Sequence, residues 1–439
     1  MNKTICGQST AVRYNRRRFE HGVTNTRFFA AATPAKRRFH LFTMKRKIAL
    51  IALLCTFPPL STDMYLAALP IMVKEWQQPL SVINLTLVLF FVAYCCGMLI
   101  YGPLSDRYGR RPPLLVGLVI YTLASIACAM APNVWGLIIA RILQGLGGAA
   151  ASTIVFAICK DLFAGPVRQR LFVQLGVITA AAPILAPIIG GWFISLLSWR
   201  WIFASLAFLG IASIGGVYAM EESLKERGGA SILAAFRGYL RLCGNTPFIL
   251  LTLSFASTGL PMFAFIAASS DIYISQLGYN EHEYGLLFAA NASAFVVAPL
   301  VFSKAVKRFS LRWLLPVSYF CVLIFAALMV WAALPPPYSL REMLPPPYTL
   351  AVPMWLLSFS VSFSRPPGNN LILEQVKKDV GAASSMMVFF YFITGALAMW
   401  IISLAWANKI AVLGCLGIGA AIITLCGWFA ARCWCGVKV

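Results

Sequence analysis

Two ionisable residues, Asp63 and Arg141, lie inside apolar stretches that are long enough to cross a lipid bilayer. A charged side chain there costs about 2.5–3.5 kcal/mol on insertion scales, so its presence indicates a function. A carboxyl at such a depth can bind and release a proton, and a nearby guanidinium would tune that exchange. Pro58-Pro59, just before the acid, is expected to break the helix and leave unpaired carbonyls. We interpret Asp63 and Arg141 as a proton-exchanging pair; a purely structural ion pair is the alternative.

Arg141 also begins a polar stripe in the fourth apolar stretch. At helical spacing, Arg141, Gln144, Gly148 and Ser152 share one face made of polar and small residues. We expect this face to line a cavity.

The string GPLSDRYGRRPPL follows the second apolar stretch and runs from Gly102 to Leu114. Its two glycines permit a tight turn, and its acid can pair with basic side chains or with a helix N-terminus. Its arginines should be held on the cytoplasmic side. The residues concerned are Gly102, Asp106, Arg107, Gly109, Arg110 and Arg111.

The fifth apolar stretch combines prolines with small residues. Pro183 and Pro187 are one turn apart, and Gly190 and Gly191 follow them. Prolines bend a membrane helix, and small residues let helices approach closely. Ordinary tight packing would use the same residues, so this pattern alone leaves both interpretations open.

The composition excludes most soluble folds, because 60% of the 439 residues are hydrophobic and 11% are charged, against roughly 45–50% and about 25% in soluble domains. A β-barrel would show short alternating segments instead of continuous apolar runs. The sequence predicts an all-α membrane protein with twelve transmembrane helices. The expected spans are 48–70, 82–103, 114–131, 134–157, 171–193, 199–220, 247–270, 283–303, 313–334, 349–366, 382–403 and 409–432.

The net charge of +22 would suggest nucleic acid in a soluble protein, but most basic residues fall in alternate loops. This positive-inside pattern predicts that both termini are cytoplasmic and gives no support for nucleic-acid binding. The twelve cysteines are mostly scattered through apolar spans, and the three histidines lie outside them. Neither set has the spacing of metal ligands, so no metal site and no cofactor is expected.

A charged linker, 221–246, divides the chain into an N-terminal bundle, 44–220, and a C-terminal bundle, 247–432, each with six helices. Two bundles can rock around a site at the midplane, although the linker can also be a simple tether. A cytoplasmic tail covers 433–439.

Two segments lie outside this plan. The basic segment 1–43 is expected to be disordered; it can be a membrane-surface arm, a targeting peptide or sequence upstream of a start at Met44. The repeat LPPPYSL and LPPPYTL, between Leu334 and Leu350, predicts an extended loop outside the cytoplasm.

Over residues 44–432 the sequence resembles the major facilitator superfamily. GPLSDRYGRRPPL is similar to its loop 2–3 signature, ARILQGLGG (Ala140–Gly148) to its fourth-helix signature and APILAPIIGG (Ala182–Gly191) to its antiporter signature. STDMYLAALP (Ser61–Pro70) resembles the first-helix signature of drug:proton antiporters, especially the Bcr/CflA branch.

The resemblance implies roles for the residues singled out above. Asp63 would be the proton and substrate carboxylate, and Arg141 would tune it, with Gln144 beside it in the signature. The loop residues from Gly102 to Arg111 would form a cytoplasmic gate. Pro183, Pro187, Gly190 and Gly191 would belong to a kinked helix that limits proton leak.

The function expected is proton-coupled export of small, neutral or singly charged, fairly apolar solutes across a bacterial cytoplasmic membrane, by a monomer driven by the proton gradient. No carboxylate lies within the spans of the second half, which disfavours dications. The residues proposed to line the cavity are Tyr65, Tyr94, Asn291 and Tyr391.

A proton-coupled uptake symporter is the main alternative, and a non-transporting scaffold is a remote one. The sequence offers no nucleophile with a base and no nucleotide-binding loop, so an enzyme is not expected.

Overall fold

The computed structural model describes residues 34–224, 232–334, 347–376 and 380–435. The chain divides into two compact units, Met1–Ala49 and Leu50–Val439. Helix α2 (Pro34–Asp63) begins in the first unit and ends in the second. Apart from the start of α2, the features described below belong to the second unit.

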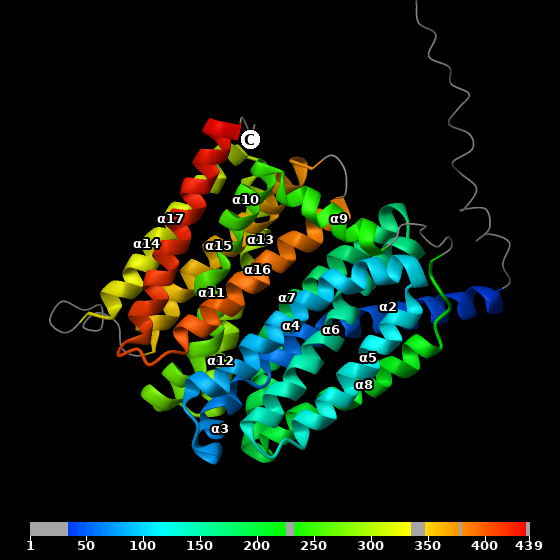
Figure 1. Cartoon of the computed structure of the whole chain (residues 1–439), viewed down its shortest axis with the longest axis horizontal. Coiled ribbons are helices and arrows are strands. Elements are labelled where there is room, and N and C mark those ends of the chain that lie inside the picture. The colour runs from blue at the N-terminus through cyan, green and yellow to red at the C-terminus, as the bar shows by residue number, and fades with distance from the viewer. Residues whose placement is uncertain (1–33, 225–231, 335–346, 377–379, 436–439) are drawn as a thin grey trace, which may run out of the picture. The chain divides into compact units, whose positions relative to one another are not determined.

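The first bundle contains six membrane spans, the first of which is interrupted (Figure 1). After α2, its elements are η3 (Leu66–Ala68), α3 (Leu69–Trp76), α4 (Leu80–Tyr108), α5 (Arg111–Ala129), α6 (Val134–Leu162), α7 (Gly165–Leu196) and α8 (Trp199–Tyr218).

The second bundle follows a short linker helix, α9 (Ile232–Cys243). Its elements are α10 (Thr246–Ala256), α11 (Gly259–Ser270), η4 (Asp271–Gln276), α12 (Glu281–Ala292), α13 (Ala294–Ala305), α14 (Leu311–Ala332), α15 (Tyr348–Glu374), α16 (Val380–Ile402) and α17 (Lys409–Cys435).

The structure confirms an all-α membrane fold with twelve spans in two bundles. Within the described residues, eleven segments are long and apolar enough to cross a membrane. The remaining span is α15, a helix of 27 residues that packs against α13 and α14. Its hydropathy is lower because it carries four buried serines in alternate positions, from Ser358 to Ser364.

Polar caps mark where several of these helices begin. The side chain of Asn133 accepts a hydrogen bond from the backbone N–H of Gly136 at 2.9 Å, at the start of α6. Asn280 and Glu283 form a reciprocal capping box at the start of α12. Such caps satisfy N–H groups that have no partner in the helix, so a polar residue after an apolar run predicts the next helix start.

The structure corrects the expected break at Pro58-Pro59, because α2 continues through both prolines to Asp63. Each proline removes only its own N–H, and neighbouring groups in a membrane bundle can satisfy the carbonyls that are freed. The first span is interrupted after Asp63 instead, where the chain continues through η3 and α3.

Two further spans that the sequence predicts as single helices are also divided. The seventh is interrupted at Ser257 and Thr258, between α10 and α11, and the eighth at Ser293, between α12 and α13. The hydroxyls of Ser257 and Thr258 donate to backbone carbonyls three residues earlier. Short polar side chains compete in this way with the helical hydrogen-bond pattern.

The N-terminal boundary also differs from the one expected. Residues 34–43, assigned from the sequence to a disordered extension, form the start of α2. Proline suits the first turn of a helix, and the alanine, lysine, arginine and leucine that follow are strong helix formers. Residues 1–33 lie outside the described residues, as does the central part of the LPPPY repeat, 335–346.

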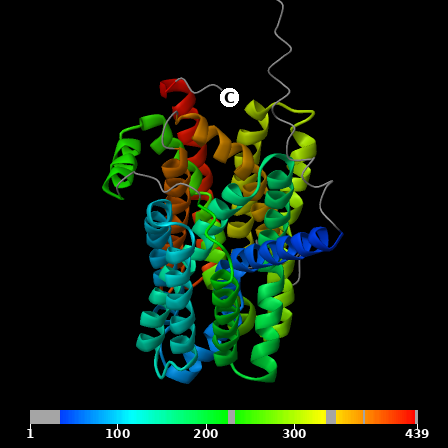
Figure 2. The same ribbon diagram turned by 90° about the vertical axis from the view of Figure 1, so that its right-hand side faces the viewer.

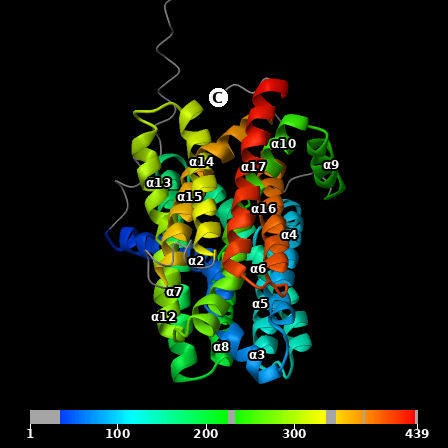
Figure 3. The ribbon, with the colours of Figure 1, turned by 90° about the vertical axis from the view of Figure 1, so that its left-hand side faces the viewer.

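The two bundles meet along α4 with α16 and along α7 with α12 (Figures 1 and 3). We call the two ends of this unit the α9 end and the α3 end, after the short helices seen there in Figure 1. Helix α9 lies to one side of the long helices (Figures 2 and 3), where it contacts α4, α10 and α16. At the α3 end, η3 contacts α11, and α3 contacts η4.

Candidate functional site

Asp63 is buried near the middle of the span Arg46–Trp76, with 5% of its surface exposed. The Thr62 hydroxyl donates to its Oδ1 at 2.8 Å. From the second bundle, Tyr284 on α12 lies close enough for the two side chains to interact electrostatically, and the Tyr284 hydroxyl is 3.0 Å from the Oγ of Ser269. Asp63 therefore lies at the junction of the two bundles.

Arg141 is fully buried inside the first bundle. Its Nη1 donates to the Ser61 carbonyl at 2.9 Å and to Gln144 Oε1 at 2.6 Å. Its guanidinium carbon lies 4.1 Å from the centre of the Phe90 ring and 5.0 Å from that of Tyr65. Cation–π contacts of this kind partly replace the hydration that the charge has lost. The guanidinium is thus held by helices α2, α4 and α6.

The structure does not bring Asp63 and Arg141 together as an ion pair, which corrects the expectation from the sequence. The reason is helix rotation. Ser61 faces the interior of the first bundle, where its hydroxyl is 2.7 Å from that of Tyr121. Asp63 is two residues further on, a rotation of about 200° at 3.6 residues per turn, so it points to the opposite side of α2.

The polar stripe on α6 also differs from its predicted role. Gln144 is fully buried and donates to Ser125 Oγ at 2.8 Å, and a Cβ on Gly148 would touch the Tyr121 ring at 3.4 Å. This part of the stripe packs against α5 and does not line a cavity, because its hydrogen-bonding groups find partners on the neighbouring helix.

A cavity of about 200 Å³ lies instead in the second bundle. Its wall is formed by α10, α15 and α16, together with Thr258 at the start of α11. The lining side chains are Thr252, Phe255, Ala256, Thr258, Ser364, Arg365, Asn369, Ile372, Leu373, Ser384, Met387, Val388, Tyr391 and Phe392.

Of the four residues proposed to line the cavity, only Tyr391 does so. Tyr65 is fully buried and its hydroxyl bonds to Thr86. Tyr94 is buried at the bundle interface, 5.3 Å from the ring of Phe392.

The fourth, Asn291, is also buried outside this wall, and its Oδ1 accepts a hydrogen bond from Ser358 at 3.1 Å. Sequence reasoning missed Arg365, which lines the cavity. A charged residue inside an apolar span indicates a function, which is how Asp63 and Arg141 were identified. Arg365, however, lies at the very end of the predicted span 349–366, where a charge is common.

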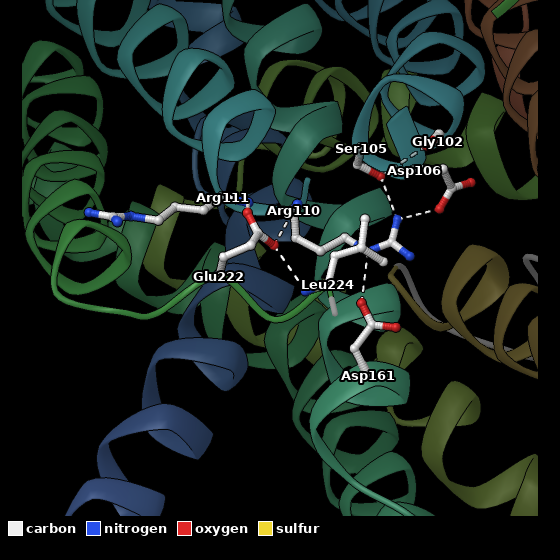
Figure 4. Close-up of polar contacts among 8 residues, drawn as sticks. All are labelled: Gly102, Ser105, Asp106, Arg110, Arg111, Asp161, Glu222 and Leu224. Atoms are coloured by element: carbon white, nitrogen blue, oxygen red, sulfur yellow. Dashed lines mark hydrogen bonds and ion pairs between the residues drawn. The ribbon is translucent and has the colours of Figure 1, made fainter. Parts of the chain in front are cut away.

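The loop between α4 and α5 forms a clasp around Arg110 (Figure 4). The Arg110 side chain bonds to Asp106, to Ser105 Oγ at 2.9 Å and to Asp161 Oδ2 at 2.9 Å. These partners tie α4 to α6 and to the start of α5. Of the other residues assigned to the gate, Arg107 stacks over Tyr108, and the Gly102 carbonyl accepts a hydrogen bond from Ser105.

Glu222, a residue that sequence reasoning did not single out, closes the clasp from the segment after α8 (Figure 4). Its two carboxylate oxygens accept from the backbone N–H groups of Arg110 at 2.9 Å and Arg111 at 3.0 Å. Gly109 has φ of 97°, and a Cβ there would come within 2.6 Å of Glu222 Oε2, so the turn requires glycine. The Arg111 side chain donates to the Tyr218 carbonyl.

The ionisation of Glu222 follows from these contacts. Partial burial by itself would raise the pKa of the carboxyl, but the backbone N–H groups that donate to it outweigh this effect and hold the pKa below its ordinary value of 4.5. The charged form is therefore the one that stabilises the start of α5, where the helix dipole also favours a negative charge.

The small residues of α7 allow close contacts at the bundle junction. A Cβ on Gly190 would overlap the Met64 carbonyl, and one on Gly191 would lie 2.8 Å from the Glu281 carbonyl of the second bundle. Gly285 on α12 faces the Pro187 carbonyl in the same way. Pro183 and Pro187 lie within α7, which continues as one helix through both.

We expect Glu222→Gln to lower the free energy of unfolding by about 1 kcal/mol, as when a helix cap is lost, because the amide keeps only one acceptor oxygen. Thermal unfolding in detergent measures this, with the exposed neighbour Glu221 changed to Gln as the control. Because the pKa of Glu222 is lowered in the folded state, the extra stability of the wild type over the variant is complete above about pH 4.5. It disappears as the pH falls through the folded-state pKa of Glu222. An advantage independent of pH would contradict this account.

We expect Gly190→Ala to destabilise the fold by about 1–3 kcal/mol, as overpacking does, because its methyl group would overlap a backbone carbonyl that cannot move aside cheaply. Gly176→Ala on the same helix is the matched control, since a Cβ there meets nothing within 4 Å. Thermal unfolding and the yield of folded protein measure both variants. Equal stability of the two would show that the junction is not tightly packed.

The comparisons with known proteins place this geometry in a family. Residues 51–399 match the family model described as Major Facilitator Superfamily. The chain is similar to a chloramphenicol resistance protein of Pseudomonas aeruginosa, with 29% identity over 83% of this chain and 86% of that protein. It is also similar to a bicyclomycin resistance protein homolog of Haemophilus influenzae, with 25% identity over 80% of this chain and 87% of that protein.

Solved structures show the same fold. A D-xylose-proton symporter aligns with a TM-score of 0.67 at 16% identity, covering 88% of this chain and 97% of that one. A bacterial homolog of the human lysosomal transporter Spinster aligns with a TM-score of 0.65 at 13% identity, covering 93% and 99%. The family model matches most of the length of this chain, and the two six-helix bundles meet at a buried acid. This chain therefore belongs to the Major Facilitator Superfamily and is a membrane transporter, not an enzyme.

Proposed function

We propose that this transporter exports small solutes from the cytoplasm in exchange for protons. The observation that carries the proposal is the position of Asp63, buried at the junction of the two bundles with Thr62 donating to it and Tyr284 nearby. A group at that junction can respond to the arrangement of both bundles. Its proton is therefore suited to couple the movement of one bundle against the other to a proton gradient.

The coupling follows from linkage. If the protonated and the ionised forms of Asp63 favour different arrangements of the bundles, and the solute favours one of them, proton and solute affect each other's binding reciprocally. Alternating exposure of Asp63 to the two sides then moves protons one way and solute the other. The energy source is the proton gradient, and the scheme needs no cofactor.

The solutes proposed are small, neutral or singly charged, and fairly apolar. In the described part of the second bundle, the acids lie at the ends of the membrane segments: Asp271, Glu281, Glu283 and Glu374. A dication would therefore find few partners there. Relatives named for resistance to chloramphenicol and bicyclomycin support drug-like molecules as cargo.

The orientation proposed has both termini in the cytoplasm of a bacterial cell, with the α9 end inside. The basic loops at that end support it, because cytoplasmic loops carry the excess of lysine and arginine. We further propose that the protein works as a monomer, because the two bundles of one chain are sufficient for alternating access around a site at the midplane.

We expect chloramphenicol to dissipate a preformed pH gradient in inverted membrane vesicles that contain the wild-type protein. Asp63→Asn should reduce this response at least tenfold, because an amide cannot carry the exchanged proton. The measurement is the recovery of a pH-sensitive fluorescent dye after the drug is added. Glu374→Gln, at an exposed acid at the end of α15, is the control and should respond like the wild type.

Two outcomes would contradict the proposal. A full response in Asp63→Asn would remove that residue from the proton path. Loss of the gradient only when solute is loaded inside the vesicles would indicate an uptake symporter, because protons and solute would then leave together.

A further inference from the structure

Arg365 lies on α15 in the wall of the cavity in the second bundle, where it is partly buried. It stands inside this span and away from the helix end at Glu374. Its guanidinium carbon is 4.3 Å from the centre of the Tyr391 ring. The two side chains make a cation–π contact, and the guanidinium makes no hydrogen bond to another residue of the part of the chain that the structure describes, so its N–H groups are available to a ligand.

The guanidinium forms no ion pair within the part of the chain that the structure describes. The ion pairs there involve Arg110, Arg200 and Lys409. The polar groups that share the cavity with Arg365 are neutral: the side chains of Thr258, Ser364, Asn369 and Ser384. A positive charge at this depth is costly unless an anion neutralises it, so the cavity is electrostatically suited to a negative ligand.

The rest of the wall indicates the shape of that ligand. Phe255, Tyr391 and Phe392 present aromatic surface to the cavity. A volume of about 200 Å³ accommodates one small ring with a short polar substituent, and aromatic walls favour a flat apolar ring. The planar guanidinium matches a carboxylate, which it can bind through two parallel hydrogen bonds.

The cavity also adjoins the interface between the bundles. Phe392, in its wall, lies 5.5 Å from Phe91 and 5.3 Å from Tyr94, both on α4 of the first bundle. Phe263 of α11 completes this aromatic cluster, 5.2 Å from Tyr391. A ligand that moves Tyr391 or Phe392 therefore acts directly on the contact along which the bundles meet.

We propose that this cavity binds small aromatic monocarboxylates, with Arg365 holding the carboxylate and Tyr391 positioning the guanidinium. The inference deepens the proposed function, on which it rests for the view that the bound molecule is exported. It restricts the singly charged cargo to anions.

The test compares salicylate with salicylamide, which has nearly the same shape and no charge at neutral pH. Equilibrium binding of the two radiolabelled compounds is measured at pH 7 on the full-length protein in phosphatidylcholine nanodiscs. We expect the wild type to bind salicylate at least tenfold more tightly. Arg365→Gln should bind the two equally, and Arg365→Lys should keep part of the preference because its ammonium attracts the carboxylate without the paired geometry.

Arg308→Gln is the matched control, because Arg308 is an exposed arginine of the same bundle outside the cavity wall, and it should keep the full preference. Tyr391→Leu provides a second variant if Arg365→Gln does not fold. It keeps the charge but removes the ring, and should weaken salicylate binding about threefold. Equal binding of the two compounds by the wild type, an undiminished preference in Arg365→Gln, or unchanged binding in Tyr391→Leu would overturn the proposal.

The binding experiment needs no proton gradient, so its result is independent of the vesicle experiment. A salicylate preference that depends on Arg365, combined with no solute-dependent proton movement in the wild-type vesicles, would refute proton-coupled export and leave the anion site standing. The reverse combination would refute the anion site alone.

Discussion

The burial of Arg141 is the constraint on which the first bundle depends. A guanidinium in a low-dielectric interior is tolerated only where hydrogen bonds and aromatic faces replace its water. Several helices contribute to these contacts, through the Ser61 carbonyl, Gln144 and the aromatic rings around the guanidinium. The helices must keep their relative positions for the guanidinium to keep these partners. Even so, Nη2 has no hydrogen-bond partner among the described residues. The packing of these helices is therefore constrained by one buried charge.

The other two charges at membrane depth serve different purposes because they are placed differently. Asp63 faces away from Arg141 toward the second bundle, so its charge acts on the junction and not on the bundle core. Arg365 lies in a cavity wall beside the Tyr391 ring, and among the described residues it has no ion-pair partner. Arg141 is thus stabilised by contacts within the protein, Asp63 lies between the two bundles, and we propose that Arg365 binds a ligand. This division matches a transporter that couples an internal proton to a separate cargo site.

Glycine contacts and the clasp determine where movement can occur. Gly190 places α7 against the backbone of Met64 within the first bundle, and Gly191 places it against α12 of the second, so the bundles touch there without intervening side chains. Around Arg110, by contrast, the bonds to Asp106, Asp161 and Glu222 all stay within the first bundle and its following segment. The clasp therefore ties α4, α6 and the start of α5 to the segment that follows α8.

The sequence alone determined the class of the protein and its spans, because hydropathy, caps and motif spacing are local properties of the chain. It could not determine the rotation of each helix, and that rotation separates Asp63 from Arg141 and packs Gln144 into the core. It also could not show that the spans break at Ser257 and Ser293, or that Arg365 lines a cavity. Those features depend on contacts between residues far apart in the sequence, which only the tertiary structure brings together.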